Sequence, residues 1–185
     1  MRLVVFLVAF SILFGMISAT QNLAFAQDTS YPVKSSTAKT IMKISSTAFA
    51  NNGKIPKKYT CDGTGISPPL KISSVPKNAK SLALIVDDPD APNGAFTHWI
   101  VWKISPKKTQ FGEGEKKGFV EGATDLGKPG YVGLCPPSGE HRYVFKLFAL
   151  DSQVDISNKS TKQELVTTMQ NHIIQTATLI GKYSR

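Results

Sequence analysis

The sequence predicts a mainly β domain, most like an antiparallel β-sandwich with few helices. Three apolar runs carry the β-branched and aromatic residues that favour strands, and they lie at residues 81–88, 98–104 and 142–150. Segments rich in turn residues separate these runs, in a chain with 14 Gly and 11 Pro. Helical spacing occurs only in one stretch near the C-terminus. Strands joined by turns, with little helix, are typical of a sandwich.

The first 39 residues are expected to lie outside this domain. Residues 1–26 combine an early Arg2, a long apolar stretch and an A-x-A site, which is the layout of a cleaved secretory signal peptide. The alternative is an uncleaved N-terminal anchor, because the stretch is near the length that spans a bilayer. Residues 27–39 are polar and predict a flexible leader. Both alternatives place the domain, residues 40–185, outside the cytoplasm, either secreted or tethered to a membrane.

The elements of the domain follow from alternation and turn signals. Residues 40–49 alternate apolar and polar and predict the first strand, whereas residues 51–70 predict a long loop. The apolar runs supply the central strands, and the run at 142–150 alternates between two faces. Residues 172–184 alternate again and predict the last strand.

One short helix is predicted before that last strand. Thr161 stands three residues before Glu164, which is the spacing of a capping box. The next apolar positions recur at helical spacing, at Leu165, Met169 and either His172 or Ile173.

The charge balance favours anionic partners. The formal net charge is +9, and removal of residues 1–26 takes away one positive charge and leaves +8. A basic protein suits phosphate groups, anionic lipid or acidic surfaces. The lysines are scattered over loop-like segments, and no helix-turn-helix, RNP-like or zinc-finger pattern occurs, so nucleic acid is not an expected partner.

The two cysteines, Cys61 and Cys135, form either a disulfide or two separate buried thiols. An even count outside the cytoplasm favours the disulfide. Because the loop between them is long, such a bridge would stabilise the fold by a few kcal/mol on the chain-entropy model, about 2–4 kcal/mol in general.

The first apolar run ends in "DDPDAP". Prolines on both sides of Asp90 fix the backbone after Asp88 and make a stiff corner that can aim a carboxylate inward. A plain Asx-Pro turn is the commoner structure for such a motif.

Histidines stand where the next two runs begin. His98 begins the second run, and a lone histidine beside Trp99 is more often packed or exposed than a ligand. His141 and Tyr143 begin the third run two residues apart, so both face one side of a strand. The preceding loop, "GLCPPSGE", is rigid and offers backbone N–H groups that can cradle an anion.

Several enzyme classes lack their motifs in this sequence. There is no G-x-S-x-G elbow, no P-loop and no H-E-x-x-H. Asp88, His98 and His141 could form a two-His-one-carboxylate metal site, but spacing alone does not support one. We therefore expect no metal, no cofactor and no catalytic residue.

In this order, "DDPDAP", "HWIVW" and "CPPSGEHRYVFKLFALD" resemble the phosphatidylethanolamine-binding protein family, in its bacterial and archaeal, Raf kinase inhibitor-like branch. "YTCDGTGISPPL" is also similar to that family, and the match spans about residues 40–185. The resemblance implies two antiparallel sheets in a Greek-key sandwich, short helices and a small pocket near one end. It also implies binding of anionic groups such as phosphorylated head groups, phosphate or acetate, and some members inhibit kinases or serine proteases.

The resemblance also implies which residues form the pocket. Its ligand-binding set would be Asp88, His98, His141 and Tyr143, with a rim made by Pro137 and the backbone from Gly133 to Cys135. Asp90 and Arg142 would be structural, with Asp90 tying the corner to nearby backbone N–H groups.

Three positions depart from the family pattern. Leu134 stands where the family usually has proline, which predicts a looser or reshaped rim. Ile72 stands where a tryptophan is frequent, and Thr97 replaces the first histidine of the eukaryotic His-His pair. Lipid head-group specificity therefore does not follow from the resemblance.

Three functions compete. The expected one is a non-enzymatic binding protein for a small anionic or phosphorylated ligand. The alternative is an inhibitor of a secreted or surface serine protease, or of a kinase, acting through a surface loop such as residues 107–128. A hydrolase or isomerase using Asp88, His98 and His141 is less favoured, because Ser138 is near but has no recognisable base.

Overall fold

A computed structural model describes residues 41–185, which form a mainly β fold. The expected signal peptide, or anchor, at 1–26 and the leader at 27–39 lie outside the described residues. The strands and helices, in chain order, are β1 (Lys43–Ser46), β2 (Gly53–Lys54), the 3-10 turn η1 (Lys57–Tyr59), β3 (Leu70–Ser73), β4 (Ser81–Asp88), β5 (Phe96–Ile104), β6 (Gln110–Phe111), β7 (Val120–Glu121), β8 (Glu140–Leu150), α1 (Lys162–Met169), the 3-10 turn η2 (Gln170–His172) and β9 (Ile173–Ser184).

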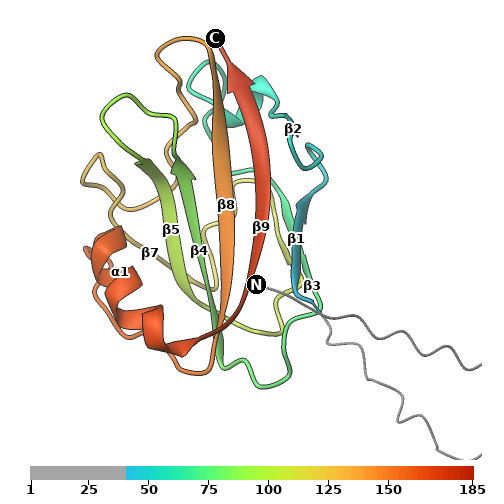
Figure 1. Ribbon diagram of the computed structural model, residues 1–185, viewed down its shortest axis with the longest axis vertical. Coiled ribbons are helices and arrows are strands. Elements are labelled where there is room, and N and C mark those ends of the chain that lie inside the picture. Colours follow the sequence, from blue (N-terminus) through green and yellow to red (C-terminus); the bar gives the residue numbers. More distant parts are fainter. Residues whose placement is uncertain (1–40) are drawn as a thin grey trace, which may run out of the picture. The chain divides into compact units, whose positions relative to one another are not determined.

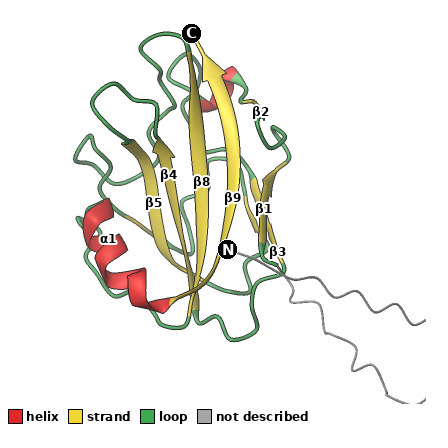
Figure 2. Ribbon diagram, in the orientation of Figure 1, coloured by secondary structure: helices red, strands yellow, loops and turns green. Residues whose placement is uncertain are grey.

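The strands form two sheets that face each other (Figures 1 and 2). The small sheet has the order β1-β3-β6, and the large sheet has the order β2-β9-β8-β4-β5-β7. β8 pairs with β4 after a crossover from β7, which brings the third apolar run beside the first. All but one of these pairings are antiparallel, and the exception is the two-residue parallel pair of β2 with β9. The predicted sandwich is thus confirmed with one short parallel addition.

The main core lies between the sheets. In β8 the buried side chains alternate along the first half of the strand, with His141, Tyr143, Phe145 and Leu147 facing inward. β4 contributes Leu82, Leu84 and Val86 to the same core, and Trp99 of β5 is fully buried there. Aliphatic and aromatic burial of this kind supplies the main driving force for folding.

A second core covers the outer face of the large sheet. Leu165 and Met169 of α1 pack there with Trp102 and Phe148. The helix begins as predicted: the Thr161 hydroxyl accepts from the Glu164 N–H, and the Glu164 carboxylate accepts from the Thr161 N–H. The predicted short helix is confirmed, and α1 ends at Met169, before the third position of the helical spacing. His172 is exposed in η2, and Ile173 begins β9.

The loop predicted at residues 51–70 is more ordered than the sequence indicates. β2 and η1 lie within it, and Tyr59 of η1 is buried. Cys61 follows directly and forms a disulfide with Cys135 across 74 residues, so the alternative of two free thiols is wrong. Within residues 41–185, no helix is long and apolar enough to span a bilayer.

Candidate functional site

Three aspartates at the end of β4 point to three different partners. Asp87 accepts from the Lys162 ammonium of α1 at 3.0 Å, and Asp88 contacts His141 of β8. Asp90 accepts from the backbone N–H and the guanidinium of Arg142. Those bonds, led by the guanidinium, lower the pKa of Asp90 to about 2. The predicted tie from Asp90 to a nearby backbone N–H is therefore present, and the corner is fixed from both α1 and β8.

Asp88 and His141 form a buried pair. The Asp88 Oδ2 lies 2.8 Å from the His141 Nδ1, and both side chains are less than a tenth exposed. A carboxylate only accepts, so the His141 Nδ1 carries the proton. The remaining ring nitrogen, Nε2, is an acceptor in the neutral ring and becomes a donor only when the imidazole is protonated.

His98 has the same tautomer for a different reason. Its Nδ1 lies 3.1 Å from the Val132 carbonyl oxygen, which can only accept. His98 is buried, and this desolvation lowers the pKa of the imidazole below 6.5 despite the carbonyl and nearby carboxylates, which oppose the shift. At neutral pH His98 is therefore uncharged, with Nε2 as an acceptor.

Tyr143 supplies a buried hydroxyl beside these two histidines. Its ring meets the His98 ring edge-on, with centroids 5.4 Å apart. Desolvation first, and then the charge of Asp88, raise the pKa of Tyr143, so the phenol keeps its proton. Among the described residues its hydroxyl has no hydrogen bond of ordinary geometry, although the Asp88 carboxylate lies near enough to act as an acceptor and to raise the pKa of Tyr143 further. A buried phenol of this kind is available to donate to a bound acceptor.

Asp88 and His98 line a cavity of about 250 Å³. Among the described residues that line it, these two have the polar side chains. The remaining lining residues are Ala91, Pro92, Phe96, Leu126, Val132, Gly133, Cys135 and Pro137. Five of the seven residues predicted for the site line this cavity. His141 and Tyr143 stand behind the lining, where His141 bonds to Asp88 and Tyr143 packs on His98.

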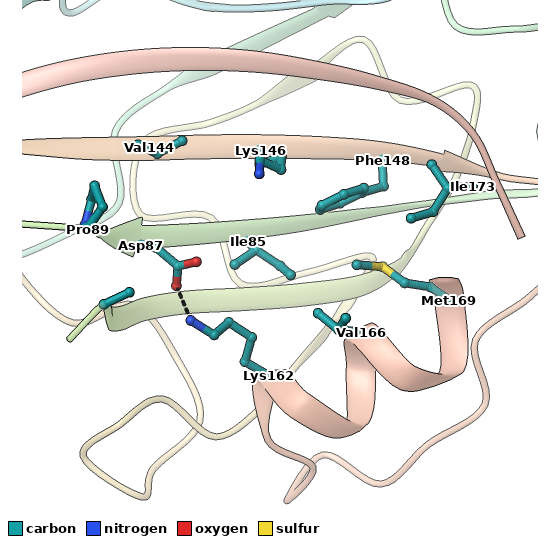
Figure 3. Close-up of a pocket in the computed structure, with 11 residues that line it drawn as sticks. Ile85, Asp87, Pro89, Val144, Lys146, Phe148, Lys162, Val166, Met169 and Ile173 are labelled. Atoms are coloured by element: carbon teal, nitrogen blue, oxygen red, sulfur yellow. Dashed lines mark hydrogen bonds and ion pairs between the residues drawn. The ribbon is translucent and has the colours of Figure 1, made fainter. Parts of the chain in front are cut away.

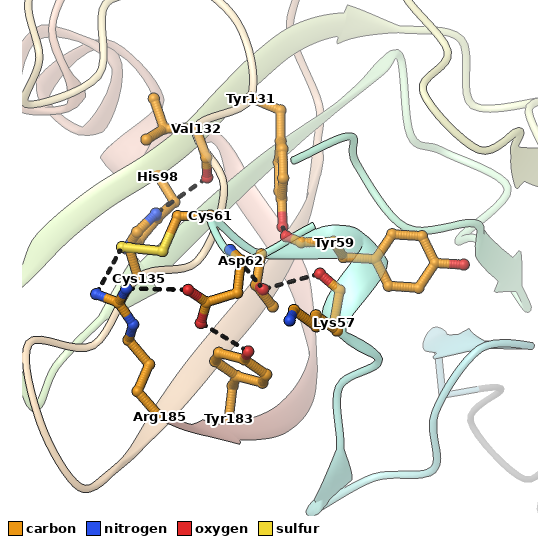
Figure 4. The surroundings of a disulfide bond; sticks show 11 residues. Lys57, Tyr59, Cys61, Asp62, His98, Tyr131, Val132, Cys135, Tyr183 and Arg185 are labelled. Carbon is orange, nitrogen blue, oxygen red and sulfur yellow. Dashed lines mark hydrogen bonds and ion pairs between the residues drawn. A yellow bond between two sulfur atoms is a disulfide. The ribbon is translucent and has the colours of Figure 1, made fainter. Parts of the chain in front are cut away.

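The rim of the cavity is anchored to the loop after η1 (Figure 4). The Cys61–Cys135 disulfide joins the two segments, and the Gly133 Cα is so close to the other segment that an added Cβ would stand 3.0 Å from backbone atoms of Thr60 and Cys61. Only glycine fits that approach without a shift. Asp62 completes the anchor, since it accepts from Tyr183 and pairs with Arg185.

The Leu134 backbone belongs to the rim, but its side chain points away from it. Its side chain is fully buried in the main core. Its N–H donates to the Tyr59 carbonyl and its own carbonyl accepts from the Cys61 N–H. A proline here would lack the first of these bonds. These contacts tie the rim to the core, and the expectation that Leu134 loosens or reshapes the rim relative to a proline stays a prediction.

Some lining residues were missed by sequence reasoning. Phe96 precedes His98 by two positions in β5, and its ring lies 4.8 Å from the imidazole. The i, i+2 spacing on a strand could have indicated it. Val132 contributes its carbonyl oxygen, which bonds to His98, and Leu126 lies in an exposed loop. Neither residue has a local sequence signal that indicates a site. Within the described part of the chain, no three His, Cys, Asp or Glu side chains gather as a metal site.

A family model described as phosphatidylethanolamine-binding protein matches residues 45–184. Curated relatives are similar over the same region. A UPF0098 protein of Methanothermobacter thermautotrophicus is 46% identical over 150 residues, covering 78% of this chain and 99% of the relative. A UPF0098 protein of Archaeoglobus fulgidus is 42% identical over 192 residues and covers all of this chain. The chain spans 60% of the length of that relative.

Solved structures agree with this similarity. The crystal structure of a phosphatidylethanolamine-binding protein homologue from Chlamydia trachomatis has a TM-score of 0.77 at 44% identity, covering 79% of this chain and 99% of the other. The Escherichia coli protein YbcL, described as a new member of the mammalian family, has a TM-score of 0.73 at 29% identity, covering 78% of this chain and 98% of YbcL.

Proposed function

The chain belongs to the phosphatidylethanolamine-binding protein family, and from this premise we propose that it is a non-enzymatic binding protein for a small anion or phosphoryl group. The ligand would occupy the cavity at Asp88 and His98. One observation carries the proposal: two buried polar side chains converge on a cavity whose other lining side chains are apolar. A small apolar cavity with few, well-placed polar groups is typical of ligand sites.

The proposed ligand chemistry follows from the tautomers. In their neutral forms His98 and His141 both use Nδ1–H inside the protein and offer only an acceptor at Nε2. An anion therefore binds with proton uptake, because a protonated imidazole adds both a donor and a positive charge. Tyr143 places a further buried hydroxyl behind the lining, beside His98. The negative charge of Asp88 repels an anion. Its hydrogen bond to His141 places the imidazole, which can take up a compensating proton, directly beside that charge.

A binding experiment tests this proposal. We expect His141→Ala to weaken phosphate binding at pH 6 by about tenfold or more, because the Asp88 charge loses its partner. The matched control is His172→Ala, which removes an exposed histidine paired with Asp151 and should leave binding unchanged. Circular dichroism separates lost binding from lost folding. If a folded His141→Ala protein bound phosphate as tightly as the wild type, the proposal that phosphate binds in this cavity would be wrong.

The ligand class is narrowed by comparing phosphate with phosphoethanolamine. A carboxylate at the cavity wall, Asp88, favours a ligand that carries an ammonium beside its phosphate, because opposite charges attract at short range. Tighter binding of phosphoethanolamine would identify a zwitterionic head group. Equal affinities would indicate a simple phosphoryl site.

The alternative, inhibition of a protease or kinase through residues 107–128, has less support. Within that segment Lys108 pairs with Glu115 at 2.7 Å and lies 4.8 Å from the centre of the Phe111 ring, so one of its lysines is held against the fold. Catalysis has no support either, because Ser138 is exposed while the Nδ1 atoms of His98 and His141 bond to Val132 and Asp88. We place the protein outside the cytoplasm, a location that a disulfide favours.

A further inference from the structure

A second and larger cavity lies on the opposite face of β4. It occupies about 450 Å³ between α1 and the outer face of the large sheet, in the size range of small-molecule sites. Ile85, Val144 and Phe148 form the sheet side, and Val166 and Met169 form the helix side (Figure 3). Asp87 and Asp88 are neighbours on β4, and they line the two different cavities.

Of the charged side chains that line this groove, two form an ion pair and one has no ionic partner among the described residues. Asp87 is paired with Lys162 at 3.0 Å, at one end of the groove. Lys146 lies between Val144 and Phe148 on β8, is exposed, and has no hydrogen-bond or ionic partner within residues 41–185. The groove therefore combines a largely apolar surface with one unmatched positive charge. An amphiphile with a single negative charge is its electrostatic complement.

We propose that this groove binds a single-chain fatty acid, with its alkyl chain along Ile85 and Phe148 and its carboxylate at Lys146. A methylene group fills about as much space as a water molecule, roughly 30 Å³, so the cavity of about 450 Å³ holds a chain of up to about fifteen carbons and does not hold a two-chain lipid. A peptide added as a strand is disfavoured, because β4 and β8 are inner strands whose backbone groups are already paired.

A chain-length series on the full 185-residue protein tests the apolar part of the site. Isothermal titration of hexanoate, octanoate and decanoate should show affinity rising about fourfold for each added methylene, since each buried methylene contributes a constant increment. Equal affinities across the series would overturn the proposal.

Substitution of the lysine tests the charged part. Lys146→Met should weaken decanoate binding about fivefold and leave decanol binding unchanged, because decanol lacks the carboxylate. Lys71→Met is the matched control on β3 of the small sheet and should change neither. Decanoate affinity that survives Lys146→Met at the wild-type value would contradict the proposed head-group contact.

Further variants separate this groove from the cavity at Asp88 and from a protein partner. Val166→Trp should fill the groove and abolish decanoate binding while phosphate binding persists, and His141→Ala should do the reverse. With these two variants, a negative result for the fatty-acid proposal does not affect the phosphate proposal, and the converse also holds. Sedimentation gives the remaining outcome: a wild-type dimer that Val166→Trp converts to monomer would assign the groove to a second copy of the chain and overturn the proposal.

Discussion

At the scale of single residues, the candidate site depends on hydrogen bonds that fix two histidine tautomers. The sequence indicates that Asp88, His98 and His141 belong to the site. It does not indicate which ring nitrogen of each histidine carries the proton. The carbonyl that fixes His98 belongs to Val132, a backbone group without any local signal. Its position is set by a loop 34 residues further along the chain. The sequence therefore indicates which residues form the site, whereas contacts between segments far apart in the chain decide which ring nitrogen of each histidine is protonated.

The pH dependence of anion affinity follows from those tautomers. We expect phosphate to bind more tightly as the pH falls from 8 to 5.5, by up to about tenfold per pH unit for each proton taken up. Burial lowers the pKa of His98, so its contribution grows at the acid end. Titration calorimetry measures this, and sulfate serves as a control because its charge is constant over the range. A flat profile for both anions would contradict the prediction.

The unpartnered hydroxyl of Tyr143 gives a second prediction. Tyr143→Phe should reduce phosphate affinity about threefold, because the hydroxyl stands behind the cavity lining and acts on the ligand only through Asp88 and His98. The free energy of unfolding should change by less than about 1 kcal/mol, because Asp88, the carboxylate near the hydroxyl, keeps its hydrogen bond to His141. Urea denaturation and calorimetry together provide the check. Strong destabilisation would show that the hydroxyl has a structural role instead.

At the scale of elements, local patterns predict where strands and the helix begin better than where they end. Thr161 and Glu164 satisfy each other at the start of α1, and both residues are visible in the sequence. The end at Met169 has no such signal, because Ile173 leaves the helical register to start β9. β2 and η1 were missed for a related reason, since the parallel partner of β2 lies in β9.

The capping box of α1 can be tested directly. Thr161→Ala should lower the free energy of unfolding by about 1 kcal/mol, since it removes the side-chain acceptor for the Glu164 N–H. Thr167→Ala, an exposed position within the helix, is the control and should cost much less. Chemical denaturation measures both variants. An equal loss at the two positions would mean that the cap contributes nothing specific.

At the scale of the whole molecule, the large sheet is buried on both faces, by the small sheet on one side and by α1 on the other. The apolar runs at β4 and β5 reflect this double burial. Sequence alone predicts the runs and the fold class. It does not give the pairing of β4 with β8, which joins segments about sixty residues apart through hydrogen bonds that any backbone can make.

The disulfide is expected to stabilise this architecture. Reduction, or the double substitution Cys61→Ser with Cys135→Ser, should lower the free energy of unfolding by about 4 kcal/mol on the chain-entropy model for a long loop. Denaturant midpoints with and without reductant provide the measurement. The double variant should be insensitive to reductant. A wild-type midpoint that reductant does not move would show that the bridge adds no stability.

The corner after β4 constrains how this sequence can vary. Asp87, Asp88 and Asp90 share four consecutive backbone positions with Pro89, yet their partners are Lys162, His141 and Arg142. Groups joined through one short, stiff segment do not respond independently when they are changed. Substitutions in this corner are therefore epistatic: an acceptable change at one aspartate depends on the residues at the other two and at their partners. Homologues should accordingly differ here by coordinated replacement of pairs, and single replacements should be rare.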